Sequence, residues 1–217
     1  MIIMGVDPGL AHTGWGIVET RGSRCRARAY GCVTTRSADP LVQRLNAIFQ
    51  EISAAVERYG PTQLAIERIF FGENSRSAIA TAQARGAALV ACGQAGLEVG
   101  EYTPMQIKQA IVGTGSADKR QVIYMVRNVL ELDHDPRPDH CADALAAAIC
   151  HANLVRTKAI TRDHAAAQML ELERAQEGAE REAARAVTAA ATAARLSHGD
   201  QGRNMVGRTR QSRRSTA

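Results

Sequence analysis

Four residues of this chain carry side chains that bind metal ions, at positions that could bring them together. Asp7 and Glu67 each end a short apolar run, and would emerge at the same sheet edge if the two runs are neighbouring strands. His140 and Asp143 lie three residues apart at the start of a third apolar stretch, and would share one face if that stretch is a helix. Crowded carboxylates repel each other unless cations separate them. The set therefore predicts a pair of hard divalent metal ions and phosphodiester chemistry.

Each of these residues also has a simpler interpretation. Asp7 precedes Pro-Gly, and an Asp in that position is often only a turn residue. Glu67 would be costly to leave unpaired at the end of a buried strand, but an ion pair with Arg68 or Arg85 could neutralise it without a metal ion. A histidine near a helix start, such as His140, is more often a surface residue than a ligand. Its spacing from the next acid on an otherwise apolar stretch favours the metal site.

Aromatic and basic residues near these acids could contact nucleic acid. Phe70 and Phe71 precede a polar segment that ends at Arg76. Core packing would explain at least one of the two rings, whereas a loop aromatic beside a metal site could stack on an unpaired base. Lys108 and Lys119 flank a Gly-Thr-Gly-Ser turn and are two of only three lysines in the chain. Lysine is usually a solvated surface residue, but a compact positive charge at these two positions suggests contact with phosphate.

The elements that must position these residues follow from periodicity and turn residues. Three hairpin strands followed by alternating helices and strands predict an α/β fold, with a mixed five-stranded sheet covered by helices on both faces. The expected strands are residues 2–6, 13–20, 25–35, 64–67 and 97–102, and the expected helices are residues 41–59, 77–96, 104–112, 118–132 and 139–155.

The composition of the whole chain fits a globular protein with an anionic partner. The chain has 217 residues, of which 45% are apolar, and its formal charge is +5. No apolar stretch is long enough to span a membrane, and the N-terminus lacks the basic region of a secretory signal. The five cysteines form no Cys-x-x-Cys pair, which is typical of reduced thiols in a cytoplasm. We therefore expect a cytoplasmic protein without a membrane partner.

The composition changes after about residue 158. Residues 161–196 are mostly Ala, Glu and Arg, which favours a helix but provides little surface for a separate core. Residues 197–217 contain five Arg, one Asp and many small polar residues, which predicts a disordered basic tail. The expected organisation is a nuclease domain over residues 1–158, a helical extension over 159–196 and the tail over 197–217.

Six segments of the chain follow the order of a known family: residues 5–16, 65–70, 83–86, 102–113, 115–119 and 139–146. In these segments the chain resembles the RuvC family of Holliday-junction resolvases. The resemblance implies a ribonuclease-H-like fold, a homodimer, and Mg²⁺-dependent cutting of two opposed strands of a four-way DNA junction in recombination and repair. It also implies two metal ions per site, with Mn²⁺ as a substitute, ends with a 5′ phosphate and a 3′ hydroxyl, and work beside the RuvA/RuvB branch-migration proteins.

The resemblance assigns roles residue by residue. The metal-binding acids would be Asp7, Glu67 and Asp143. The position three residues before Asp143 is Asp in some relatives and His in others, so His140 could bind metal or move a proton. The family normally ends soon after this stretch, so residues 161–217 lie outside the resemblance.

The same resemblance places Lys108 and Lys119 near the cleaved phosphate and Phe70 against bases at the junction centre. Phe71 and Arg76 are expected to help bind DNA. The Ala-rich segment 77–96 is the candidate dimer helix, because small residues let two helices approach closely.

Three other interpretations remain open from the sequence. Sugar-kinase and actin-like ATPases share a Gly-x-Asp-x-Gly strand-turn, but they need a second phosphate loop and an adenosine site in a much longer chain. A non-catalytic DNA-binding module could use the basic tail, but would not need four metal-binding residues. Short relatives that process ribosomal RNA share the nuclease fold, but Phe70 and the two lysine segments fit a junction enzyme better.

Overall fold

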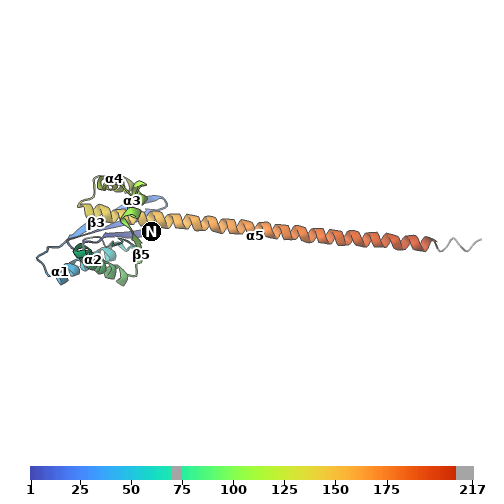
Figure 1. Ribbon diagram of the computed structural model, residues 1–217, viewed down its shortest axis with the longest axis horizontal. Helices are drawn as coiled ribbons and strands as arrows, with labels where there is room; N and C mark the ends of the chain where they lie inside the picture. The colour runs from blue at the N-terminus through green and yellow to red at the C-terminus, as the bar shows by residue number, and fades with distance from the viewer. Residues whose placement is uncertain (70–74, 209–217) are drawn as a thin grey trace, which may run out of the picture. The chain divides into compact units, whose positions relative to one another are not determined.

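The computed structural model describes residues 1–69 and 75–208, without the side chains of residues 75–77, 183 and 192–208. The chain divides into two compact units, Met1–Lys158 and Ala159–Ala217. Figure 1 shows the elements in chain order, and all the strands lie in the first unit. Within the described residues, no helix is both long and apolar enough to cross a membrane.

A five-stranded mixed sheet forms the centre of the first unit, as the sequence predicts. Its spatial order is β3-β2-β1-β4-β5. β1 pairs antiparallel with β2, and β2 with β3, whereas β1, β4 and β5 run parallel. β1 and β4 are parallel neighbours, so their last residues, Asp7 and Glu67, lie at the same edge. The strands are β1 (Ile2–Asp7), β2 (His12–Arg21), β3 (Arg24–Thr34), β4 (Gln63–Glu67) and β5 (Glu98–Tyr102).

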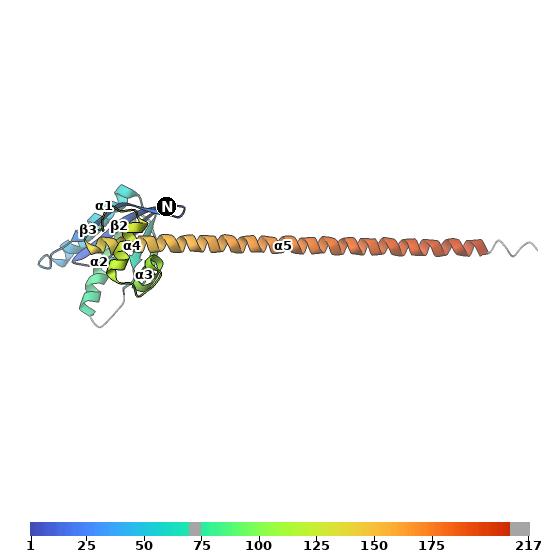
Figure 2. The same ribbon diagram turned by 90° about the horizontal axis from the view of Figure 1, so that it is seen from above.

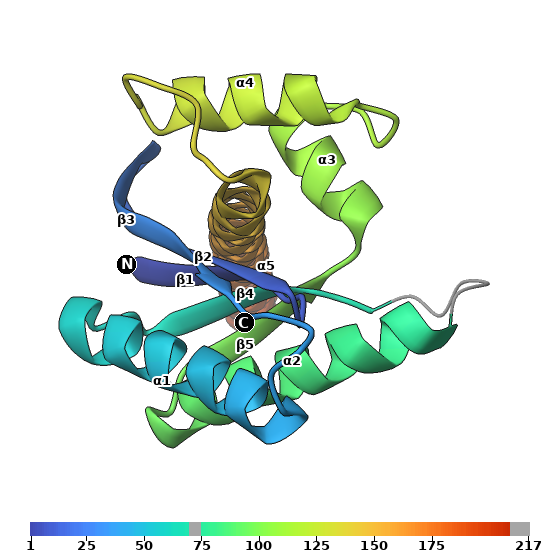
Figure 3. The same cartoon turned by 90° about the vertical axis from the view of Figure 1, so that its left-hand side faces the viewer.

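Helices cover both faces of this sheet. Figure 3, seen along α5, shows α1 (Leu41–Tyr59) and α2 (Ser75–Gln94) on one face. The other face carries α3 (Pro104–Val112), α4 (Lys119–Val129) and the start of α5 (Asp139–Arg208). Alternate side chains of each strand point to opposite faces. Two cores result: Met4 and Val6 pack with α1 and α2, whereas Ile3 packs with α5 and its neighbours.

Capping residues fix the starts of the two helices that carry Lys108 and Lys119. Thr103 caps α3 and Asp118 caps α4, each in a capping box in which the third helical residue bonds back to the cap. The glycine Gly113 ends α3 with a φ of 86°, a conformation that disfavours other residues. Lys108 therefore lies on α3 and Lys119 is the first residue of α4. Figure 2 shows these two helices.

Three glycines let α5 lie unusually close to the sheet. A Cβ atom on Gly5 of β1 would overlap the carbonyl of Ala144, and one on Gly14 of β2 would overlap the carbonyl of His140. A Cβ on Gly16, opposite Gly5 in the ladder, would press on the side chain of Leu145. The first turns of α5 are thus seated directly on the strands that carry the site.

The second unit is helical where the structure describes it. α5 continues without a break beyond Lys158 to Arg208, and Met169, Leu172 and Val187 are exposed on it. Residues 197–208, which the sequence places in a disordered tail, are helical, and residues 209–217 lie outside the described residues. Extending an established helix costs little, and Ala-rich sequence favours it.

Candidate active site

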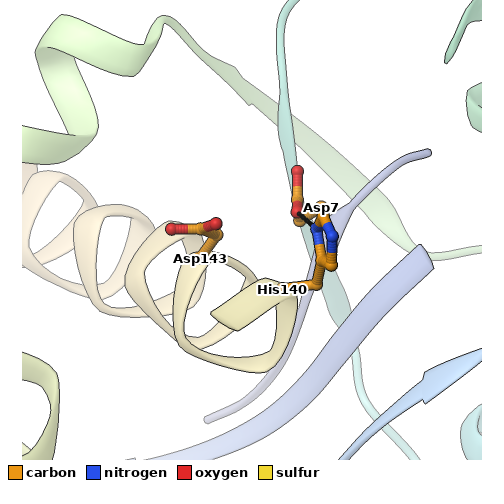
Figure 4. A group of neighbouring side chains, drawn as sticks. All are labelled: Asp7, His140 and Asp143. Atoms are coloured by element: carbon orange, nitrogen blue, oxygen red, sulfur yellow. Dashed lines mark hydrogen bonds and ion pairs between the residues drawn. The ribbon is translucent and has the colours of Figure 1, made fainter. Parts of the chain in front are cut away.

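Asp7, His140 and Asp143 form one cluster of potential metal ligands. One ligand atom from each lies within 4.8 Å of the others. Figure 4 shows the Asp7 carboxylate at the end of β1 beside the His140 ring, with Asp143 projecting from the next turn of α5. The His140 Nδ1 atom is 2.7 Å from Asp7 Oδ2. The i,i+3 spacing and the strand end therefore bring together the residues that the sequence singles out.

Glu67 lies beside this cluster and is not one of its three members. It lines a cavity of about 160 Å³ together with Asp143, Lys108 and Lys119. Burial, and then the negative charges of Asp7 and Asp143, raise the pKa of Glu67 to about 7. Its carboxylate therefore faces the same negative field as the other acids.

Among the side chains that the structure describes, no arginine forms an ion pair with Glu67. The simpler interpretation of its sequence position predicts an ion pair with Arg68 or Arg85. Both arginines instead approach Glu101 on β5, at 3.8 Å from Arg68 and 2.6 Å from Arg85. The ion-pair interpretation of Glu67 is therefore wrong for these two partners.

Lys119 supplies the positive charge nearest to the acids. Its Nζ atom is 2.9 Å from Asp143 Oδ2 and 3.8 Å from Asp139 Oδ2. Burial alone would lower the pKa of Lys119, but the hydrogen bond to Asp143 and the neighbouring acids raise it, so the ammonium stays charged. Burial raises the pKa of Asp143 despite this lysine. One lysine thus offsets only part of the charge of three carboxylates.

His140 is set in place by two contacts. Its hydrogen bond to Asp7 raises the pKa of the imidazole, against the opposing effect of burial. The ring of His12 stacks on the ring of His140, with centroids 5.4 Å apart and planes at 19°. No pattern in the sequence singles out His12. The only signal was its place in the Gly-rich turn after Asp7, which does not indicate a partner far along the chain.

The donor set fits hard divalent cations. Carboxylate oxygens are the ligands that Mg²⁺ prefers, and an imidazole is better suited to Mn²⁺. Burial, and then the neighbouring carboxylates, raise the pKa values of Glu67 and Asp143, so a bound cation would stabilise both in their charged form.

Three of the predicted DNA-contacting residues lie before α2 or in its first turn. Phe70 and Phe71 lie outside the described residues, and the side chain of Arg76 is likewise not described. Lys108 and Lys119 both line the cavity that holds Glu67, on the side of α3 and α4.

This fold, with acids gathered at the end of its first strand, defines the class of ribonuclease-H-like nucleases. The family model for crossover junction endodeoxyribonuclease RuvC matches residues 3–151. The chain belongs to the RuvC family.

Several RuvC proteins are similar to this chain over most of their own length. The RuvC of Pelotomaculum thermopropionicum is 50% identical over 153 residues, which cover 70% of this chain and 93% of that protein. The RuvC of Rubrobacter xylanophilus is 49% identical over 160 residues, covering 74% and 89%. Thermus thermophilus RuvC in complex with a Holliday junction substrate is 39% identical, with a TM-score of 0.70 over 73% of this chain and 96% of that chain.

Proposed function

We propose that this protein resolves four-way DNA junctions in recombination and repair, as a metal-dependent crossover junction endodeoxyribonuclease. The single observation that carries the proposal is the Asp7–His140–Asp143 cluster beside Glu67 in a chain of the RuvC family. The Thermus thermophilus relative, which binds a Holliday junction substrate, supports the choice of DNA structure.

The cluster would hold two Mg²⁺ ions, with Mn²⁺ as a substitute. Asp7, His140 and Asp143 offer one group of ligands, and Glu67 offers a further carboxylate across the adjoining cavity. Bound divalent cations would activate water and stabilise the charge that develops on the phosphate and the leaving oxygen. The products would be a 5′ phosphate and a 3′ hydroxyl.

The chain's own residues orient the substrate and move protons. Lys108 and Lys119, on the wall of the cavity, would bind oxygens of the cleaved phosphate as point charges. The Asp7 carboxylate favours a proton on Nδ1 of His140, because an ionised carboxylate has no proton to donate and can only accept the hydrogen bond. Nε2 of His140 is then left with a lone pair that can bind a cation or accept a proton.

A homodimer would place two such sites on the two opposed strands of a junction, because its twofold symmetry matches that of the DNA. We assign the dimer contact to α2, on which Ile79 and Val90 are 57% and 55% exposed. Phe70, Phe71 and Arg76 would contact bases and backbone near the junction centre. The RuvA/RuvB branch-migration proteins would deliver the junction, in the cytoplasm.

The test is incubation of the full chain with a synthetic four-way junction and a matched linear duplex, in Mg²⁺ or in chelator. We expect paired cuts in the junction alone, only with Mg²⁺, and ligatable ends. Glu51→Gln, an exposed acid on α1, is the matched control for charge removal and should cut normally. Equal cutting of the duplex, or cutting in chelator, would overturn the proposal.

A further inference from the structure

A second cavity lies beside the metal cluster and contains an arginine, Arg44, that has no acidic partner among the described side chains. It has a volume of about 340 Å³ and is lined by Gly9, His12, Arg44, Thr81 and His140, among others. His140 belongs both to this cavity and to the cluster with Asp7 and Asp143. The cavity therefore shares His140 with the metal cluster, and its other lining residues come from α1, α2, the turn after β1 and the start of β2.

Arg44 is anchored by one edge of its guanidinium. Its Nε atom donates to Thr35 Oγ1 at 2.8 Å, and the Thr35 hydroxyl in turn donates to the carbonyl of Leu10 at 2.6 Å. Among the side chains that the structure describes, those of residues 1–69, 78–182 and 184–191, no carboxylate forms an ion pair with Arg44. A guanidinium that is held at Nε, and whose two terminal nitrogens form no ion pair with a described carboxylate, is suited to bidentate binding of an anion.

The turn of residues 9–11, which lines the cavity, is held by hydrogen bonds. The Thr13 hydroxyl donates to the carbonyl of Gly9 at 2.7 Å, and the Thr35 amide donates to the carbonyl of Ala11 at 2.9 Å. A Cβ atom on Gly9 would lie only 2.5 Å from the carbonyl oxygen of His12, so the compact turn needs glycine there. These bonds tie the turn to β2 and to the residue after β3.

We propose that this cavity binds a backbone phosphate of the cleaved DNA strand, next to the phosphate that is cut. Arg44 binds the non-bridging oxygens, and His12 and Thr81 line the same space. A free anion would be repelled by the nearby carboxylates, whereas a phosphate of the bound strand is brought there by the other contacts of the DNA. This assignment rests on the proposed function and extends it to a second phosphate.

The test uses the full chain and junctions with one neutral methylphosphonate, on either side of the cleaved phosphate. Arg44→Gln should lower kcat/KM on the all-phosphate junction by roughly 10- to 100-fold, as expected for a lost charged hydrogen bond. The loss should disappear on the junction whose methylphosphonate replaces the bound phosphate, and persist on the other. Arg44→Lys, which keeps the charge, should recover part of the rate. Arg58→Gln, an exposed arginine on the same helix, should cut within about twofold of the parent protein.

Each arm has an outcome that overturns the assignment. An equal loss of kcat/KM on all three junctions would make Arg44 a structural anchor of Thr35. In that case Arg44→Gln should also lower the melting temperature, and Arg44→Lys should recover activity only to the extent that it restores the melting temperature. Competitive inhibition by millimolar inorganic phosphate that disappears in Arg44→Gln would assign the cavity to free phosphate instead of the strand. A parent protein that cuts no junction would overturn the proposed function itself, and is distinguishable from all of these.

Discussion

Two histidines on α5, His140 and His151, lie in opposite environments. His140 has a side chain that is 38% exposed, and it contacts an acid, Asp7, through one nitrogen. His151 is 5% exposed and uses both nitrogens: Nδ1 accepts from the Tyr102 hydroxyl at 2.8 Å and Nε2 donates to Gln63 Oε1 at 2.7 Å. The Gln63 amide then donates to Glu98 at 3.1 Å, so the chain of hydrogen bonds ends in an acceptor.

The pKa values move in opposite directions for a physical reason. The hydrogen bond to Asp7 raises the pKa of His140, whereas burial lowers the pKa of His151. The His151 network is neutral at its centre and complete, as a buried polar group requires. The His140 cluster instead gathers carboxylates at a sheet edge, where their negative charges repel each other. A satisfied network indicates a structural role, and crowded carboxylates at a sheet edge indicate a site suited to cations.

The largest expected effect comes from removing one acid of the cluster. Asp7→Asn, Glu67→Gln and Asp143→Asn should each abolish cleavage in Mg²⁺, because each would remove a ligand charge. Junction binding should stay largely intact, because it rests on phosphate contacts spread over the surface. Cleavage assays and fluorescence anisotropy measure the two. A variant that cuts at the parent rate would remove that residue from the site.

Substitution of His140 should have a large effect that depends on the replacement. We expect His140→Ala to lose roughly 10- to 100-fold in rate. His140→Asp should retain activity, because a carboxylate can replace imidazole as a ligand, and Mn²⁺ should support at least as much cleavage by the parent protein as Mg²⁺. A well-folded His140→Asp that hardly cuts would favour proton transfer over ligand exchange.

Substitution of His151 should act on stability and not on chemistry. His151→Leu leaves the Tyr102 hydroxyl and the Gln63 amide without their partner, and should cost about 2 kcal/mol in the free energy of unfolding. Tyr102→Phe removes one bond only and should cost less. Urea unfolding measures both, and cleavage corrected for folded protein should remain near the parent value. A stable His151→Leu variant that fails to cut the junction would show that His151, like His140, takes part in cleavage.

The same histidine predicts a pH dependence of stability. The folded pKa of His151 lies below its usual value, so the unfolded chain binds more protons as pH falls below about 6.5. The contribution of His151 is therefore full above that pH and is lost as pH falls toward the folded pKa. Glu98 and Lys158 act on it in opposite directions. Unfolding measured from pH 7.5 to 5 should show a decline that is smaller in His151→Leu.

The smallest effect is expected from removing the C-terminal part of the chain, beyond the first turns of α5 that pack on the sheet. Removal of residues 161–217 should leave the fold and junction cleavage intact, because every candidate site residue precedes it. Duplex binding at low salt should weaken, with a shallower dependence on salt, since fewer arginines release counterions. Titration at several salt concentrations measures this slope. An unchanged slope would reject a DNA-tethering role, and an unfolded truncation product would show that the extension stabilises the core.

The sequence by itself determined the five strands, the helices and the edge at which Asp7 and Glu67 emerge. Those features follow from period, capping residues and turns, which act between near neighbours in the chain. The spacing of His140 and Asp143 likewise placed both on one helix face.

Only the tertiary structure decided which distant residues meet. It stacked His12 on His140, paired Arg68 and Arg85 with Glu101, and left Arg44 facing a cavity beside the cluster. It also showed why Gly5 and Gly14 are needed, since they admit the backbone of α5. These contacts join residues far apart in the chain, and close packing of helix on sheet selects them. No local pattern encodes that packing.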